Sequence, residues 1–199
     1  MPILIEDLAY LETELKNFRH DLHMHPELGF NEKRTSFKIA EELKSFGIEV
    51  STEVGKTGVV GILKKGHGTK NIMLRADMDA LPINEKSSHH YTSKNPGVMH
   101  ACGHDGHTAM LLGAAKFLAN NDCFSGTVYF VFQPNEEHGL GAKAMLEDGL
   151  LERFPAKEIY GIHNLPGAPL GEFSTRVGVI CASETLFEIM IEGRGGHSS

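Results

Sequence analysis

Three absences narrow the class of this protein. The 199 residues include only three cysteines, widely spaced and odd in number, so no disulfide framework is predicted and a reducing compartment is favoured. No apolar run approaches the ~20 residues that a helix needs to cross a bilayer. The N-terminus turns acidic after three apolar positions and lacks a basic segment, unlike a secretion signal. We therefore expect a soluble, cytoplasmic protein with no membrane partner.

Clusters of basic residues are missing too. The formal net charge is −7 and no run of Lys or Arg offsets it, so we expect no nucleic-acid partner. The length suits one domain, or one domain and the start of another. Histidine is what the chain has in excess, because five of its twelve histidines lie between positions 89 and 107. The usual reason for such a local enrichment is metal or proton chemistry.

The hydrophobic pattern predicts helices and strands that alternate along the chain. Asn31 is expected to cap the second helix, with Phe37 on its apolar face, and Met110 is expected on the buried face of the third. Alternating helices and strands indicate an α/β layer architecture. Helices are predicted over residues 4–24, 31–47, 108–119 and 139–146, and strands over residues 48–54, 58–63, 71–75, 126–132, 159–163 and 186–192.

Residues 98–107 hold three histidines, a thiol and a carboxylate directly before a predicted helix. Cys102 and His104, two positions apart, are typical zinc-type ligands, and the start of a helix would hold them firmly. His100 and His107 are interpreted as residues that flank the loop and begin the helix. A second histidine-rich segment, residues 20–28, is better explained as the flank of the first helix than as a set of ligands.

Acidic side chains and a histidine follow three of the predicted strands. Asp77 and Asp79 come after the third strand and are expected to bind a metal or to orient a metal-bound histidine, the alternative being a solvated turn. Glu136 and Glu137 are adjacent in a non-helical stretch, so their side chains point in different directions. One can bind metal while the other accepts a proton from a metal-activated water. Taken alone, this pair is better explained as an exposed acidic loop.

His163, at the end of another predicted strand, completes a set of four candidate ligands. A thiolate, two imidazoles and a carboxylate can begin to hold two divalent ions, each with an open coordination position.

Together these segments resemble a known family. Residues 99–107, 133–137 and 161–166 are similar to the signature of the M20 metallopeptidases, and residues 75–82 and 23–29 match the same branch. That branch contains amidohydrolases such as hippurate hydrolases, N-acetyl-diaminopimelate deacetylases and auxin-conjugate hydrolases. The resemblance covers essentially the whole chain.

The resemblance implies an enzyme with a dinuclear metal site. It would cleave the amide bond of N-acyl amino acids by metal-activated water, using two divalent ions among Zn, Mn, Co and Ni. The implied metal ligands are Cys102, His104, Glu137 and His163, and the implied general base is Glu136, with Asp79 orienting a ligand. His197 resembles a histidine that helps to stabilise the oxyanion, in some members from across a dimer.

The resemblance also implies a fold and a domain division. The expected architecture is α/β, a mixed-sheet, zinc-exopeptidase-like catalytic domain with helices on both faces over residues 1–182. Residues 183–199 would begin a small α+β lid domain through which a homodimer can form. Family members run further and supply one more histidine ligand, so we expect either a fragment of a longer chain or a truncated product with little activity.

Two alternatives stay open at this point. The same chemistry would let a family member act as a dipeptidase or aminopeptidase, and the choice depends on what recognises the free end of the substrate. The other alternative is a truncated, non-catalytic metal-binding fragment.

Overall fold

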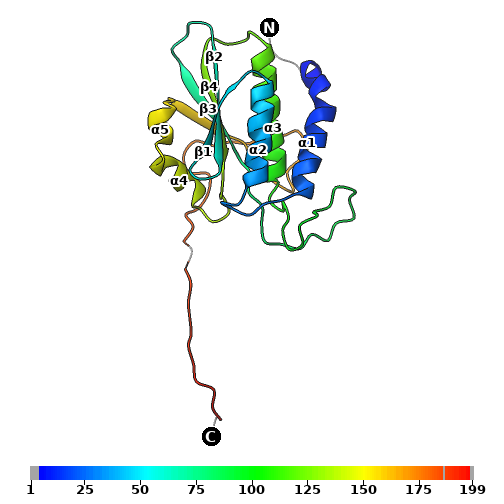
Figure 1. Ribbon diagram of the computed structural model, residues 1–199, viewed down its shortest axis with the longest axis vertical. Helices are drawn as coiled ribbons and strands as arrows, with labels where there is room; N and C mark the ends of the chain where they lie inside the picture. The colour runs from blue at the N-terminus through cyan, green and yellow to red at the C-terminus, as the bar shows by residue number, and fades with distance from the viewer. Residues whose placement is uncertain (1–4, 186, 198–199) are drawn as a thin grey trace. The chain divides into compact units, whose positions relative to one another are not determined.

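A five-stranded mixed sheet forms the centre of the structure, a computed structural model that describes residues 5–185 and 187–197 (Figure 1). The strand order is β1-β2-β4-β3-β5, so the 126–133 strand lies in the middle. β1 pairs with β2 and β2 with β4 in antiparallel fashion, whereas β3 runs parallel to both β4 and β5. The strands are β1 (Glu49–Val54), β2 (Gly58–Lys65), β3 (Asn71–Asp77), β4 (Gly126–Gln133) and β5 (Glu158–Gly161).

Helices cover both faces of this sheet (Figure 1). Three longer helices lie on one face and two short ones on the other, each face with its own cluster of buried apolar side chains. The first face carries α1 (Glu12–Met24), preceded by the 3-10 turn η1 (Ile5–Leu11), with α2 (Lys33–Ser45) and α3 (His104–Asn120), and the second carries α4 (Gly141–Glu147) and α5 (Leu150–Arg153). The mixed α/β architecture with helices on both faces is therefore confirmed.

The central strand β4 shows how the sequence produces these two layers. Successive side chains of a strand point to opposite faces. Accordingly Val128, Phe130 and Phe132 lie in the cluster under α1, α2 and α3. Tyr129 and Val131 lie in the cluster under α4 and α5. Since both faces are covered, the strand is apolar at nearly every position.

Two details of the predicted helices are wrong. Asn31 does not cap α2, whose first residue is Lys33. Instead the Glu27 carboxylate accepts hydrogen bonds from the backbone N–H groups of Arg34, at 3.1 Å, and Thr35, at 2.8 Å. Phe37 and Met110 point to solvent, with 65% and 51% of their surface exposed, because neighbouring positions on the same helices fill the space against the sheet. Leu4, where the first helix was predicted to begin, is outside the described residues.

Contacts divide the chain into two units, Met1–Asn164 and Leu165–Ser199. The described part of the second unit contains neither helix nor strand. The strand predicted over residues 186–192 is therefore absent at 187–192, where Phe187, Ile189 and Ile191 are exposed and no neighbouring strand satisfies the backbone. Residue 186 is outside the described residues. The predicted domain boundary after residue 182 stays a prediction.

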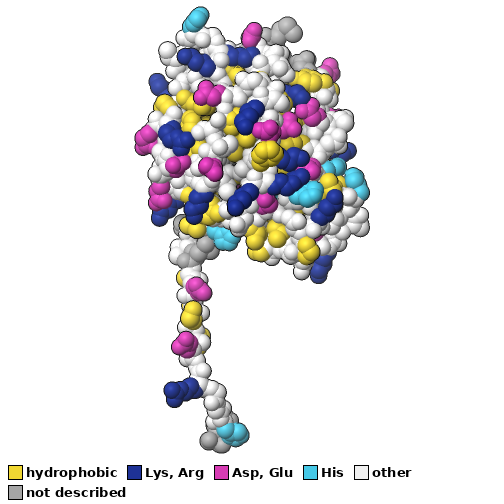
Figure 2. Space-filling model, in the orientation of Figure 1, with side chains coloured by type: hydrophobic (Ala, Val, Ile, Leu, Met, Phe, Trp, Pro, Cys, Tyr) yellow, Lys and Arg dark blue, Asp and Glu magenta, His cyan; other side chains and the backbone are white. Residues whose placement is uncertain are grey.

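The surface of the first unit carries charges of both signs. In the view of Figure 2, Lys and Arg side chains are interspersed with Asp and Glu rather than gathered into one patch. Among the described residues, no helix combines the length and the apolar character that crossing a membrane requires.

Candidate metal centre

The site lies where the parallel strands β3 and β4 end together. Asp77, the last residue of β3, stands opposite Gln133, the last residue of β4, and the N–H of Met78 donates to the carbonyl of Gln133 at 3.1 Å. The loops that carry Asp79 and the two glutamates therefore leave the sheet side by side. The Thr108 hydroxyl of α3 donates to the Asp77 carbonyl at 3.0 Å, which holds the start of α3 against this edge.

Gly103 makes the turn into α3 possible. Its φ of 88° lies in the left-handed region, where a side chain is strained. A Cβ at this position would also lie 2.4 Å from the Asn164 side-chain oxygen. The turn thus brings Cys102 and His104 close to the segment that carries His163.

His104 is completely buried, and one of its two ring nitrogens makes no hydrogen bond. Its Nδ1 donates to the Asp79 carboxylate at 3.2 Å, which leaves the Nε2 lone pair facing the site with no hydrogen-bond partner. That Nε2 lies 3.8 Å from a carboxylate oxygen of Glu136 and 3.8 Å from one of Glu137. Burial lowers the pKa of His104, but the Asp79 hydrogen bond and the charge of Asp77 outweigh burial and raise it.

Cys102, His104 and Glu137 form one group whose candidate ligand atoms all lie within 4.8 Å of one another. Burial, together with the nearby carboxylates of Glu137 and Glu136, raises the pKa of the Cys102 thiol to about 11. Burial also raises the pKa of Glu137, and its Oε1 is buried without a partner. These shifts share a cause, because the pocket gathers anionic groups away from water. Such a group of donor atoms suits a cation.

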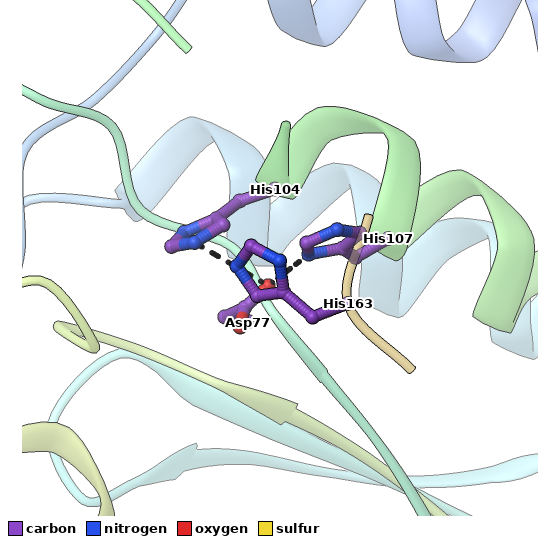
Figure 3. Close-up of side chains that lie close together, drawn as sticks. All are labelled: Asp77, His104, His107 and His163. Atoms are coloured by element: carbon purple, nitrogen blue, oxygen red, sulfur yellow. Dashed lines mark hydrogen bonds and ion pairs between the residues drawn. The ribbon is translucent and has the colours of Figure 1, made fainter. Parts of the chain in front are cut away.

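Asp77, His104, His107 and His163 form a second group by the same distance criterion (Figure 3). Within it, His107 has both ring nitrogens occupied. Nδ1 faces Asp77 at 2.6 Å, and Nε2 accepts from the backbone N–H of Asn164 at 3.0 Å. Burial raises the pKa of Asp77, but the His107 hydrogen bond and the charge of Arg75 outweigh it and hold that pKa below its usual range.

His163 has the opposite arrangement. Its Nδ1 donates to the backbone carbonyl of Asn164 at 2.7 Å, while its Nε2 faces the Cys102 sulfur at 3.4 Å. One nitrogen is therefore oriented by the backbone and the other is directed at the thiol. His104 belongs to both groups, so the two groups are adjacent and share one residue.

The donor set fits divalent cations. It offers one sulfur, two imidazole nitrogens and a carboxylate oxygen, which suit zinc and the later first-row metals. Each candidate histidine ligand has its second nitrogen held by a carboxylate or a backbone carbonyl, as metal-binding histidines usually do. The orphaned Nε2 of His104 and Oε1 of Glu137 are the buried polar atoms that an ion would satisfy.

The structure thus brings together the predicted residues Cys102, His104, Glu137 and His163, with Glu136 beside them. His197 belongs to the second unit, and its role stays a prediction. The pairing of Asp77 with His107 was missed by sequence reasoning. Its signal was the position of His107 one helical turn after His104, on the same face of α3.

A protein-family model matches the part of the chain that contains this site. The model described as "Peptidase family M20/M25/M40" matches residues 73–197, more than half of the chain. The chain belongs to this family. The M20 match begins in β3 and includes both candidate metal groups.

Two curated M20 relatives are similar over nearly the whole chain. A hippurate hydrolase of Campylobacter jejuni is 50% identical over 98% of this chain and 51% of its own length. An N-acetylcysteine deacetylase of Bacillus subtilis is 45% identical over 94% of this chain and 49% of its own length. The chain therefore spans about half the length of the curated relatives it matches.

A solved M20 structure is similar in fold as well. A dinuclear metal-binding peptidase of Bacillus subtilis aligns with a TM-score of 0.77 and 44% sequence identity, over 82% of this chain and 46% of that one.

Proposed function

We propose that this M20 protein is a metal-dependent amidohydrolase that cleaves the amide bond of N-acyl amino acids. One observation carries the proposal. Near the end of β3 and β4, Cys102, His104 and Glu137 bring ligand atoms within 4.8 Å of one another, His163 Nε2 lies 3.4 Å from the Cys102 sulfur, and a further carboxylate, Glu136, lies beside them. The names of the hippurate hydrolase and the N-acetylcysteine deacetylase support this substrate class.

Cys102, His104, Glu137 and His163 would hold two divalent ions, among Zn, Mn, Co and Ni. The hydrogen bonds support this set over one that includes His107, because both nitrogens of His107 are held by groups outside the set, whereas His163 Nε2 faces the Cys102 sulfur, itself a candidate ligand. When bound, the ions lower the pKa of a water and polarise the amide carbonyl. The name of the dinuclear relative supports a pair of ions rather than one.

Glu136 is the proposed general base. Its side chain is 38% exposed, against 15% for Glu137, so it can reach a substrate while its neighbour faces the buried donors. Its carboxylate takes a proton from the attacking water and delivers it to the nitrogen of the departing amine. His197 is proposed to donate a hydrogen bond to the oxyanion. Asp79 holds His104 in the orientation that keeps Nε2 free.

Replacing Glu136 with glutamine in the complete, metal-loaded protein tests the proposal. The amide keeps the shape but cannot accept the proton, so kcat should fall by roughly 10²–10⁴-fold with hippurate or N-acetyl amino acids. Metal content should stay unchanged. Glu147→Gln is the matched control, because Glu147 is an exposed α4 residue away from the site and should keep full activity. Turnover of Glu136→Gln near that of the wild type would contradict the role of the base.

Peptide cleavage is the second candidate, because the related B. subtilis structure is named a peptidase. Assays of hippurate, N-acetyl amino acids and dipeptides side by side separate the two activities. Two bound ions without hydrolysis of any of them would support the non-catalytic alternative. A homodimer formed through residues 183–199 and a cytoplasmic location are also proposed, to be checked by light scattering and by cell fractionation.

A further inference from the structure

Residues 27–32, between α1 and α2, contact both loops that build the candidate metal centre. The carbonyl of Glu27 accepts from the N–H of Ala80 at 2.9 Å, and Leu28 forms a parallel bridge with Ala80, next to Asp79. Glu32 reaches the other loop. Its first residues, 27–29, belong to the stretch that resembles the family signature, yet the segment supplies none of the candidate ligands.

Glu32 is completely buried, and both of its carboxylate oxygens are used. Oε1 accepts from the backbone N–H of Asn135 at 2.8 Å, and Oε2 accepts from the Thr57 hydroxyl at 2.7 Å. Burial raises the pKa of this carboxyl, while the two hydrogen bonds oppose the rise. A buried carboxyl is costly, so a position that keeps one needs a reason.

The loop that Glu32 holds is in an uncommon conformation. Asn135 has a φ of 43°, in the left-handed region, which asparagine adopts more readily than most other residues that carry a side chain. Its carbonyl accepts from the N–H of Gly141 at 3.0 Å, and its side-chain oxygen accepts from His138 Nδ1 at 2.9 Å. Gly29 leaves room for this side chain, since a Cβ there would lie 2.0 Å from the Asn135 Oδ1. Contacts within the loop and the Glu32 carboxylate from outside it together hold this turn.

We propose that Glu32 is a positioning residue that fixes the turn at Asn135 and thereby aims the Glu136 carboxylate at the reacting water. The inference rests on the proposed function, in which Glu136 is the base. Among the described residues, the hydrogen-bond partners of the Glu32 carboxylate are Thr57 and the backbone N–H of Asn135, and it acts through the latter, in the residue directly before Glu136. The N–H of Glu137, on the same turn, is separately held by Asp79 at 3.1 Å, so loss of the Glu32 bond should leave this candidate metal ligand near its place.

The test compares Glu32→Ala with Glu32→Gln in the complete, metal-loaded protein. Alanine removes both hydrogen bonds, so hydrogen exchange of the peptide that covers residues 134–138 should become at least about tenfold faster. With N-acyl amino acids kcat should fall about 10- to 100-fold while KM changes less than about threefold, the size expected when a reacting group is misplaced by about 1 Å. Glutamine can still accept from Asn135 and donate to Thr57, so it should stay within about threefold of the wild type.

Leu43→Ala is the matched control for lost stability. Leu43 lies in α2, the helix that follows Glu32. It is fully buried and packs in the apolar cluster under α1, α2 and α3, away from the loop at residues 134–138. It should lower the melting temperature without faster exchange at residues 134–138. If Glu32→Ala does not fold, Thr57→Val is the substitute, because valine removes the hydrogen bond from Thr57 to Glu32 with little change in shape. Thr57→Val should make hydrogen exchange at residues 134–138 faster and kcat lower, each by about two- to fivefold.

Unchanged exchange at residues 134–138 in the folded variant would overturn the proposal. So would an equal loss of kcat in Leu43→Ala at the same loss of stability. If the wild-type protein hydrolyses none of the substrates, the proposed function fails, and the exchange measurement still decides whether Glu32 holds the turn.

Discussion

Asp79 connects two parts of the candidate metal centre, and its replacement tests how the site is held. The buried carboxylate accepts one hydrogen bond from His104 Nδ1, at 3.2 Å, and one from the backbone N–H of Glu137, at 3.1 Å. Asp79→Ala removes both, so a candidate ligand ring can rotate and a candidate ligand carboxylate loses its backbone anchor. Residues that orient metal ligands typically contribute 10- to 100-fold in affinity, or roughly 1.4–2.7 kcal/mol. Because Asp79 orients two candidate ligands, we expect a loss near the upper end, about 100-fold.

Asp79→Asn should have a smaller effect. An amide offers one oxygen to one of the two donors, and its NH₂ group then faces the other N–H, so one bond survives and the expected loss is about tenfold. Competition with a chromogenic chelator at constant pH measures the Zn affinity of the wild type and of each variant. Asp122→Ala serves as the control, because the Asp122 side chain is 98% exposed. An affinity of Asp79→Ala within threefold of the wild type would refute the orienting role.

The remaining predictions concern pH and metal removal. His23 lies between the Asp105 carboxylate, at 2.8 Å, and that of Glu85, at 3.2 Å, and the Asp105 hydrogen bond raises its pKa despite burial. This contribution to the free energy of unfolding is complete below the unfolded pKa of about 6.5 and is lost as pH rises through the higher folded value. In urea titrations of metal-free protein, His23→Gln should therefore lower the free energy of unfolding more near pH 6 than at pH 9. An equal loss of free energy at both pH values would contradict this. EDTA should abolish hydrolysis and lower the melting temperature, and Zn, Mn or Co should restore both; activity that survives thorough metal removal would exclude the proposed chemistry.

Much of the fold follows from local sequence pattern. The apolar run of β4 and its flanking turns mark a strand buried on both faces, and the structure puts it in the middle of the sheet. The end of α1 before Pro26 follows from the geometry of proline. The errors at Asn31, Phe37 and Met110 arise from tertiary contacts. Which of several apolar residues on a helix is buried depends on the surface that it meets, and the α2 cap comes from the Glu27 carboxylate outside the helix.

The candidate site was predictable where its residues are close in sequence. Cys102 with His104 and Glu136 with Glu137 are local motifs, and their chemistry could be read directly. The contacts that hold them are separated by 30 residues for Asp77 and His107 and by 103 for Glu32 and Asn135. A local pattern can place His107 on the same helix face as His104, but it cannot name the partner, which depends on which strands are neighbours and in which register.

The register of β3 against β4 also has a consequence for insertions and deletions in natural or engineered variants of this chain. Side chains alternate along a strand, so one residue deleted within β4 would exchange its two faces and uncouple Asp77 from Gln133. Both apolar clusters and the departure point of the glutamate loop would change together. Residues 86–92 lie in a surface loop outside the strands, where extra length should be tolerated. Insertions in this loop should therefore leave the fold intact, whereas insertions or deletions within β4 should disrupt it.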